Sequence, residues 1–307
     1  MTEDAGRLRE AALGRWLVVG AAFFWGTSAT LARSVFRDLN VPVLTVVELR
    51  LLIASVLLGL WLVFRHPAAL RVRRADWLYF VILAMLGVAT VQASYYYSIS
   101  VLGVGLAILV QYIAPTLIVL VDIMRGRPVH RITIIAVLAA LAGTALLVSN
   151  AGASRIAATA WQWMIAFSSA VWFAFYILYS KRGLERYRPE TVLFYTFAVA
   201  GTFWAFVTSP AKILAAGYDT RTWLLFLVLG VFSTLVPFSL FYAGLKRMKA
   251  AEAGIIATTE PVIASVSAAL LLHEGLIPLQ WLGAALVLVA AVAASREHNS
   301  EEAKAHG

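Results

Sequence analysis

A carboxylate beside a proline interrupts the apolar stretch 251–272, and such a group can carry a proton or bind an amine. Glu260 stands near the middle of that stretch, directly before Pro261. A carboxylate in an apolar setting must be neutral, paired or in contact with water. Glu260 is therefore a candidate for proton coupling or for binding a substrate amine. The alternative is a hydrogen-bonded, structural glutamate beside a helix kink.

Glu48 and Arg50 place two further charges inside the apolar stretch 42–64. Residues two apart on a helix point about 200° apart, so these two are not expected to pair with each other. Arg50 could hold a substrate carboxylate, although an arginine at this depth more often pairs with a neighbouring helix or caps carbonyl groups. Glu48 is a second candidate for proton coupling.

Pro115 and Pro261 lie well inside two apolar stretches and predict helix kinks. An interior proline removes one backbone hydrogen bond, at a cost of about 3 kcal/mol in water. In a membrane the freed carbonyl must find a neighbouring donor or line a wet cavity. A pair of functional kinks is one interpretation, and a packing kink inherited by both copies of a repeat is the other.

Polar and aromatic side chains at similar depth could complete a binding pocket, because such pockets combine apolar walls with a few fixed polar groups. Gln111 is the strongest of them, since an amide at lipid depth needs hydrogen-bond partners. Each could equally be a packing residue. The candidates are Trp25, Gln92, Gln111, Tyr112, Trp172, Tyr176, Thr258 and Thr259.

These residues sit in stretches that the composition assigns to lipid. Of 307 residues, 62% are hydrophobic and 13% charged, against about 45–50% apolar and about 25% charged in soluble domains. Each stretch is long enough for a hydrocarbon core of about 30 Å. The ten expected transmembrane helices are 15–36, 42–64, 76–98, 104–124, 131–149, 159–181, 189–209, 221–244, 251–272 and 277–295.

The basic residues, which give a net charge of +9, fall mainly in the loops on the side of both termini. This asymmetry predicts a multi-pass protein of a bacterial-type inner membrane, with both termini cytoplasmic. A lipid bilayer is thus the expected partner, and nucleic acid is not. The Tyr95-Tyr96-Tyr97 cluster is interpreted as part of an interfacial aromatic belt. The chain has no cysteine, which excludes disulfides and thiolate chemistry.

The chain also matches itself at a near-constant spacing, which predicts a tandem duplication with residues 1–150 as helices 1–5 and residues 151–307 as helices 6–10. Because five is odd, the second copy must cross the membrane in the opposite orientation, as in many secondary transporters. The fold class is therefore an all-α membrane protein of two inverted repeats. The matched pairs are Trp25 with Trp172, Pro42 with Pro189, Trp77 with Trp223, Tyr96 with Tyr242, Ala107 with Ala253 and Pro115 with Pro261.

Short motifs occur in order along both halves. They are Phe24-Trp25-Gly26-Thr27-Ser28, Glu48-Leu49-Arg50-Leu51-Leu52, Tyr112-Ile113-Ala114-Pro115, Glu260-Pro261-Val262, Leu272-His273-Glu274 and Gly283-Ala284-Ala285-Leu286. With these motifs, the sequence resembles the drug/metabolite transporter superfamily, specifically its ten-helix EamA-type exporters. The resemblance implies a central cavity lined by helices 1–4 and 6–9, with helices 5 and 10 at the edge.

Small residues crowd helices 5 and 10 and permit close helix approach. They favour packing within the chain, and a homodimer through these two helices is a further expectation. The residues are Ala136, Ala140, Gly143, Gly283, Ala290, Ala291 and Ala294.

The sequence therefore predicts a secondary transporter that exports small metabolites, such as amino acids or their derivatives, by alternating access. No phosphate-binding loop is present, so ATP is not the expected energy source; proton coupling and facilitated efflux stay open. The alternative is an efflux carrier for drugs or toxic compounds. A membrane-embedded enzyme is remote because no second histidine follows His273-Glu274 at metal-ligand spacing, and a channel is remote because of the inverted repeat. We expect no catalytic residue, metal or cofactor.

Overall fold

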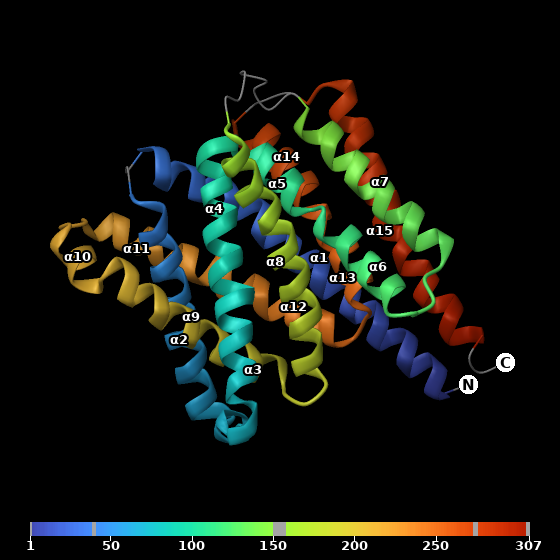
Figure 1. Ribbon diagram of the computed structural model, residues 1–307, viewed down its shortest axis with the longest axis horizontal. Coiled ribbons are helices and arrows are strands. Elements are labelled where there is room, and N and C mark those ends of the chain that lie inside the picture. The colour runs from blue at the N-terminus through green and yellow to red at the C-terminus, as the bar shows by residue number, and fades with distance from the viewer. Residues whose placement is uncertain (1, 39–40, 150–157, 273–275, 305–307) are drawn as a thin grey trace.

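The chain is all-helical throughout the part that the structure describes. The computed structural model describes residues 2–38, 41–149, 158–272 and 276–304, which form helices and short connections without a strand (Figure 1). The expected all-α class is thus correct. The boundary between residues 150 and 151, and the motif residues His273 and Glu274, lie outside the described residues, so the division into domains stays a prediction.

The expected stretches of the first half appear as helices, two of them irregular. The third runs without a gap from η2 through α4 but contains the π-helical turn η3, and the fourth is interrupted at Tyr112–Ile113, between α5 and α6. The elements are α1 (Thr2–Asp38), α2 (Val43–Arg65), η1 (Pro67–Leu70), η2 (Arg74–Asp76), α3 (Trp77–Ile82), η3 (Leu83–Ala89), α4 (Thr90–Leu102), α5 (Val104–Gln111), α6 (Ala114–Met124) and α7 (Arg131–Val148).

The second half follows the same plan, with one added short helix, α10, after its second long helix. The elements are α8 (Ala160–Leu184), α9 (Pro189–Thr208), α10 (Pro210–Ala215), α11 (Thr220–Gly230), η4 (Val231–Leu235), α12 (Val236–Lys246), α13 (Ala250–Ala257), α14 (Thr259–Leu272) and α15 (Pro278–Lys304).

Eight helical segments of the described chain are long and apolar enough to cross a membrane. The first and ninth expected spans are helical, but they are not among the eight. The ninth is divided at Thr258 into α13 and α14, neither of which has the length of a span by itself. The count of ten therefore stays a prediction. The eight segments are Val43–Arg65, Arg74–Leu102, Gly105–Met124, Arg131–Val148, Ala160–Leu184, Pro189–Thr208, Thr220–Lys246 and Pro278–Ser295.

Each half contains two departures from regular α-helix at matching places. A π-helical turn forms η3 in the first half and η4 in the second. A second departure comes shortly before a proline, at Tyr112–Ile113 ahead of Pro115 and at Thr258 ahead of Pro261. The sequence did not predict the π-helical turns, which often occur at functional sites.

α7 and α15 form the most extensive helix pair of the molecule, at the right of Figure 1. A side chain at Gly143 would collide with the carbonyl of Gly283, and one at Gly283 with the carbonyl of Gly143. Ala136, Ala140 and Ala290 are buried in the same region. These small residues therefore serve contacts within one chain. A homodimer through these helices stays a prediction and would have to use their other faces.

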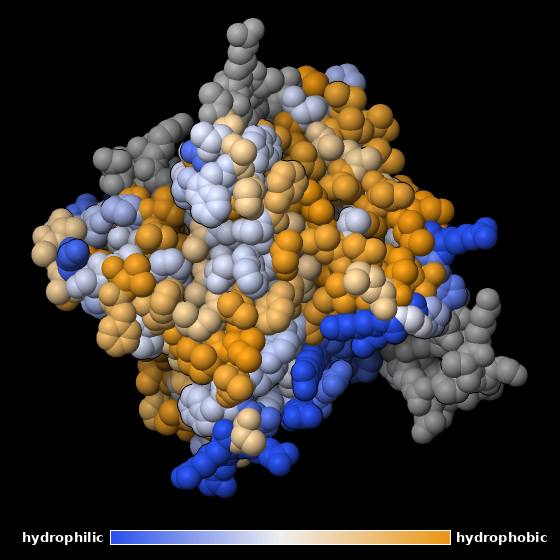
Figure 2. All heavy atoms as spheres, in the orientation of Figure 1, coloured by the Kyte–Doolittle hydropathy of each residue, from blue (hydrophilic) through white to orange (hydrophobic). Residues whose placement is uncertain are grey.

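The surface separates an apolar belt from a basic end. Figure 2 shows apolar residues across the middle and upper right of the face in view, and hydrophilic residues along its lower edge and lower right. The exposed apolar side chains include Phe64 and Phe206, at 79% and 85% exposure. The exposed Arg65 is the last residue of α2, and the exposed Arg71 and Arg186 lie in the turns after α2 and α8. In Figure 1 those turns lie at the bottom, toward the same side as both chain ends.

Candidate functional site

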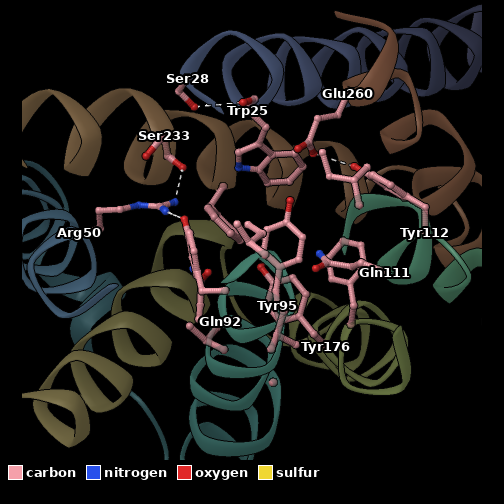
Figure 3. A pocket seen from close by; sticks show the side chains of 18 of the residues that line it. Trp25, Ser28, Arg50, Gln92, Tyr95, Gln111, Tyr112, Tyr176, Ser233 and Glu260 are labelled. Atoms are coloured by element: carbon pink, nitrogen blue, oxygen red, sulfur yellow. Dashed lines mark hydrogen bonds between the residues drawn. The ribbon is translucent and has the colours of Figure 1, made fainter. Parts of the chain in front are cut away.

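A cavity of about 600 Å³ lies among the helices of both halves (Figure 3). Its lining residues come from α1, α2, η3, α4, α8, η4, α12 and α14 and from the end of α5. The resemblance implied that helices 1–4 and 6–9 all line it. Helix 7, which is α9, departs from this, because none of its residues is among those that line the cavity. Phe197 of α9 instead packs behind the wall residue Phe238, with ring centroids 5.4 Å apart.

Seven of the predicted site residues meet at this cavity, and six others do not. Those that line it are Trp25, Arg50, Gln92, Gln111, Tyr112, Tyr176 and Glu260. Those outside its lining are Glu48, Pro115, Trp172, Thr258, Thr259 and Pro261. α2, α8 and α14 contribute to both sets, so on these helices the direction of each side chain separates them.

Arg50 is buried and joins three elements by hydrogen bonds to neutral groups. Its Nε donates to the hydroxyl of Thr234 (2.8 Å), and its Nη2 donates to the carbonyl of Ser233 (3.0 Å). Its Nη1 donates to the hydroxyl of Tyr96. Ser233 lies in the π-helical turn η4, so the irregular backbone supplies an acceptor for the arginine. Figure 3 shows the guanidinium pointing from α2 toward the cavity.

Glu48 points away from Arg50, as the helical spacing predicted. It is fully buried and accepts a hydrogen bond from the hydroxyl of Thr208 at the end of α9. The carboxylate therefore lies between α2 and α9 rather than in the cavity. Its proposed part in proton coupling would have to act through the helix contact and not through direct contact with a substrate.

Glu260 enters the cavity from α14, opposite Arg50 in Figure 3. Its Oε2 accepts a hydrogen bond from Tyr112 (2.7 Å). The same hydroxyl lies 3.0 Å from the carbonyl of Ala257. Gly26 of α1 packs directly on this part of α14, because a Cβ there would lie 2.8 Å from the carbonyl oxygen of Glu260. The carboxylate is thus held at a tightly packed crossing of two helices.

Thr258 and Thr259 turn away from the cavity. Their hydroxyls donate to the carbonyls of Ile255 (2.6 Å) and Ile256 (2.8 Å) in the preceding helix, α13. Short hydroxyl side chains commonly make such local bonds, and here they satisfy carbonyls at the break between α13 and α14. Both residues are buried. We therefore assign them to the helix break rather than to substrate contact.

Trp172 does not line the cavity, although its counterpart in the first half, Trp25, does. Its counterpart Trp25 lines the cavity and packs edge-on against Phe238, with ring centroids 5.0 Å apart. On α8 the cavity face is taken by Phe173 and Tyr176, which lie one helical turn apart. Trp172 precedes Phe173 by one residue and so points about 100° away.

The cavity is also lined by residues that the sequence did not predict to lie there. Tyr95 and Tyr96 were interpreted as an interfacial belt, but both line the cavity, and only Tyr97 of this cluster is exposed. The sequence did contain a feature that predicts this position for Tyr95 and Tyr96: they lie three and four residues after Gln92, which places all three on one face of a helix. Ser233 was missed because its position depends on the π-helical turn.

Gln111 brings an unused acceptor to the cavity wall. Its Oε1 is buried without a hydrogen-bond partner among the described residues. A buried amide oxygen without a donor is costly, so it is suited to accept from a ligand. No group of three or more His, Asp or Glu side chains in the described chain is arranged to hold a metal ion.

Toward the basic end the cavity stops at a layer of buried aromatic residues. Tyr176, Phe241 and Tyr242 are almost fully buried, and the hydroxyls of Tyr242 and Ser180 are 2.9 Å apart. Beyond this layer, Lys181 donates to the carbonyls of Leu245 and Lys246. These contacts close the cavity on that side.

Polar pairs between the two halves continue the closure at the basic end. Arg15 of α1 pairs with Glu252 of α13 at 2.8 Å. Tyr187, in the turn after α8, donates to Asp76 at 2.6 Å. Burial, followed by this hydrogen bond, raises the pKa of Tyr187 above its ordinary value, so its hydroxyl remains a donor at neutral pH.

Comparison with known proteins gives the same outline over the whole chain. The EamA-like transporter family matches residues 12–149 and again residues 160–296. The inner membrane transporter YicL of Salmonella typhimurium, itself uncharacterized, is 28% identical over 88% of this chain and 91% of its own. The threonine/homoserine exporter RhtA of Escherichia coli is 28% identical over 90% of this chain and 88% of its own. A solved crystal structure matches with a TM-score of 0.75 at 21% identity, over 92% of this chain and 96% of that chain.

Proposed function

The chain belongs to the EamA-like transporter family, and from this premise we propose that it exports a small amino acid or a close derivative by alternating access. The membrane is a bacterial-type inner membrane, with both termini in the cytoplasm. The transported molecule occupies the cavity between Arg50 and Glu260. Arg50 holds the carboxylate of the substrate, and Glu260 with Gln111 receives its ammonium group.

One observation carries this proposal: the cavity presents an arginine and a glutamate that are each held by neutral partners. Arg50 donates to Tyr96, Ser233 and Thr234, while Glu260 accepts from Tyr112. A zwitterion supplies the opposite charge for each group, which offsets the cost of keeping charges away from water. The volume of about 600 Å³ is within the range of small-molecule pockets.

The similarity to a threonine/homoserine exporter supports an amino acid as substrate. The closed basic end and the cavity beside it support alternating access, since a carrier must seal one side while the other is open. The matching π-helical turns and helix breaks of the two halves support a repeat whose halves exchange conformations. Glu260 is the proton-coupling group of the proposal because it is the carboxylate that lines the cavity.

The competing function is the export of lipophilic cations. The aromatic wall, with Trp25, Tyr95, Phe173 and Phe238, favours such a ligand because aromatic faces attract cations. Arg50 opposes it, since a second positive charge in the same cavity is repelled. Export of an amino acid therefore needs the positive charge of Arg50, whereas export of a lipophilic cation is opposed by it.

Counterflow in proteoliposomes separates the two functions. Proteoliposomes that contain the purified protein are loaded with unlabelled threonine or with tetraphenylphosphonium, and accumulation of the labelled compound is followed for wild type, Arg50→Met and Glu260→Gln. We expect threonine counterflow that both variants lose and that Glu190→Gln, in the first turn of α9, retains. Counterflow of tetraphenylphosphonium that persists or increases in Arg50→Met would overturn the proposal in favour of a cation carrier. Counterflow of neither compound would also contradict it.

A further inference from the structure

The hydroxyl of Tyr112 lies between two acceptors, although it has only one proton to donate. Its oxygen is 2.7 Å from Oε2 of Glu260 and 3.0 Å from the carbonyl oxygen of Ala257. A phenol can donate one hydrogen bond and accept others. Both contacts can therefore be satisfied together only if Glu260 is itself protonated and donates to the phenol.

The carbonyl of Ala257 needs this donor because of Pro261. In a regular helix it would accept from the backbone N–H four residues later, and that residue is Pro261, which has no N–H. The carbonyls of Ile255 and Ile256 accept from Thr258 and Thr259. Tyr112 thus provides the donor for the carbonyl that the proline frees.

The phenol comes from the corresponding break in the first half. Tyr112 directly follows α5, and α6 begins two residues later with Ala114 and Pro115. Pro115 in turn lies against Gly254 of α13. The irregular segments of helices 4 and 9 are therefore in contact, and Tyr112 is the hydrogen-bonding link between them.

We propose that Tyr112 transmits the protonation state of Glu260 to the break between α13 and α14. When Glu260 is ionised, the phenolic proton is donated to the carboxylate, and the carbonyl of Ala257 loses its donor. When a proton from cavity water binds Glu260, the carboxylic acid donates to the phenol, and the phenol donates to Ala257. Protonation then fastens helix 9 to helix 4, and deprotonation releases the break.

This inference rests on the proposed part of Glu260 in proton coupling and assigns Tyr112 as a positioning residue. The other groups that face the carboxylate are few. Arg50 of α2, Tyr95 of α4 and Tyr176 of α8 line the same cavity, and α1 contributes Trp25 and Gly26. Arg50 bears the one charge among them, and no second carboxylate is among the residues that line the cavity.

The absence of cysteine from the whole sequence makes a site-specific test direct. Thr258→Cys introduces a single thiol at the break, where the native residue is 1% exposed. Its rate of reaction with a methanethiosulfonate reagent reports how often the break opens. The rate is measured at several pH values in detergent, and dividing it by the rate in a Glu260→Gln background removes the pH dependence of the thiol itself.

We expect this ratio to rise about fivefold from low to high pH, which is the effect of losing one neutral hydrogen bond. Tyr112→Phe should make the ratio independent of pH, whereas Tyr95→Phe, which removes a phenol from the same cavity, should leave its pH dependence in place. Pro261→Ala supplies an N–H to the carbonyl of Ala257, so it should abolish the dependence even with Tyr112 present. This second variant keeps the test decisive if Tyr112→Phe does not fold.

A ratio that does not change with pH in the parent protein would overturn the inference. So would a pH dependence that survives Tyr112→Phe or Pro261→Ala. Labelling requires no substrate, so failure of the amino-acid proposal in counterflow and failure of the Tyr112 link are distinguishable outcomes.

Discussion

The two ends of the helix bundle are held together by different kinds of contact. At the basic end, charged pairs join the halves directly, as in Arg15 with Glu252 and Arg247 with Glu10. Around the cavity, the charged groups Arg50 and Glu260 are bound by hydroxyls and a carbonyl instead. Arg186 with Asp76 is a third charged pair between the halves, and it also lies at the basic end.

This difference separates closure from recognition. In a charged pair the two side chains already compensate each other's charge, so the pair can serve as a closing contact without a ligand. A charged side chain held by neutral donors or acceptors keeps its charge available to a ligand. Alternating access, as proposed, requires the charged pairs between the halves to break when the cavity opens toward the basic end. The stability of those pairs then sets how much of the protein is closed there.

The largest effect is expected at Arg50. Arg50→Met keeps the length of the side chain but removes the charge, and a hydrogen bond to a charged group is worth about 1.5–3 kcal/mol. We expect threonine counterflow to fall about 10- to 100-fold, with the protein still folded by its thermal transition. Unchanged counterflow would show that recognition at this end does not use the arginine.

Gly26 tests whether Glu260 depends on close helix packing. A Cβ at this position would lie 2.8 Å from the carbonyl oxygen of Glu260 and 2.9 Å from the backbone nitrogen of Ala264. Backbone atoms cannot move aside cheaply, so Gly26→Ala should lower the free energy of unfolding by about 1–3 kcal/mol. Thermal denaturation in detergent measures this.

Gly20→Ala is the matched control on the same helix. Its Cβ would meet only the flexible side chain of Leu240, at 3.4 Å. Alanine also favours helix over glycine by up to about 1 kcal/mol, so this variant should be neutral or slightly stabilising. Equal losses for the two variants would contradict the assignment of a tight crossing at Gly26.

Glu252 tests the closing contacts of the basic end. It is 5% exposed and pairs with Arg15, whose side chain is 15% exposed. Glu252→Gln removes the charge while keeping the shape, and an impaired charged hydrogen bond should open this end about tenfold more often. The readout is labelling of a single cysteine at Ser180, which is fully buried behind the closing layer. A labelling rate unchanged by Glu252→Gln would show that the pair does not hold this end closed.

The contrast between the two ends also shows which features a sequence can predict. Apolar length predicted the helices, and the separation of Glu48 from Arg50 followed from helical geometry alone. Trp172 could not be placed in the same way, because one residue of difference on α8 turns a side chain about 100°. The same limit applies to Thr258 and Thr259. A threonine hydroxyl can bind either a ligand or a nearby backbone carbonyl, and the sequence is the same in both cases.

Ser233 and α9 illustrate a second limit. The carbonyl of Ser233 that binds Arg50 lies in a π-helical turn, and the length and composition of the apolar stretch do not predict such a turn. The family resemblance placed helix 7 at the cavity, but the packing of Phe197 behind Phe238 moves it out of the wall. Such details depend on contacts between distant segments, which local periodicity does not encode.

The smallest effect is expected at Glu10, and it limits the comparison of the two ends. Its pair with Arg247 has the same 2.8 Å separation as the pair of Arg15 with Glu252, but the side chain of Glu10 is 63% exposed. Exposed pairs contribute about 0–1 kcal/mol because water and salt screen them. Glu10→Gln should therefore change the labelling of the cysteine at Ser180 by less than about twofold, and the small change should disappear in high salt. If Glu10→Gln opened the basic end as much as Glu252→Gln does, then the number of charged pairs, and not their burial, would keep this end closed.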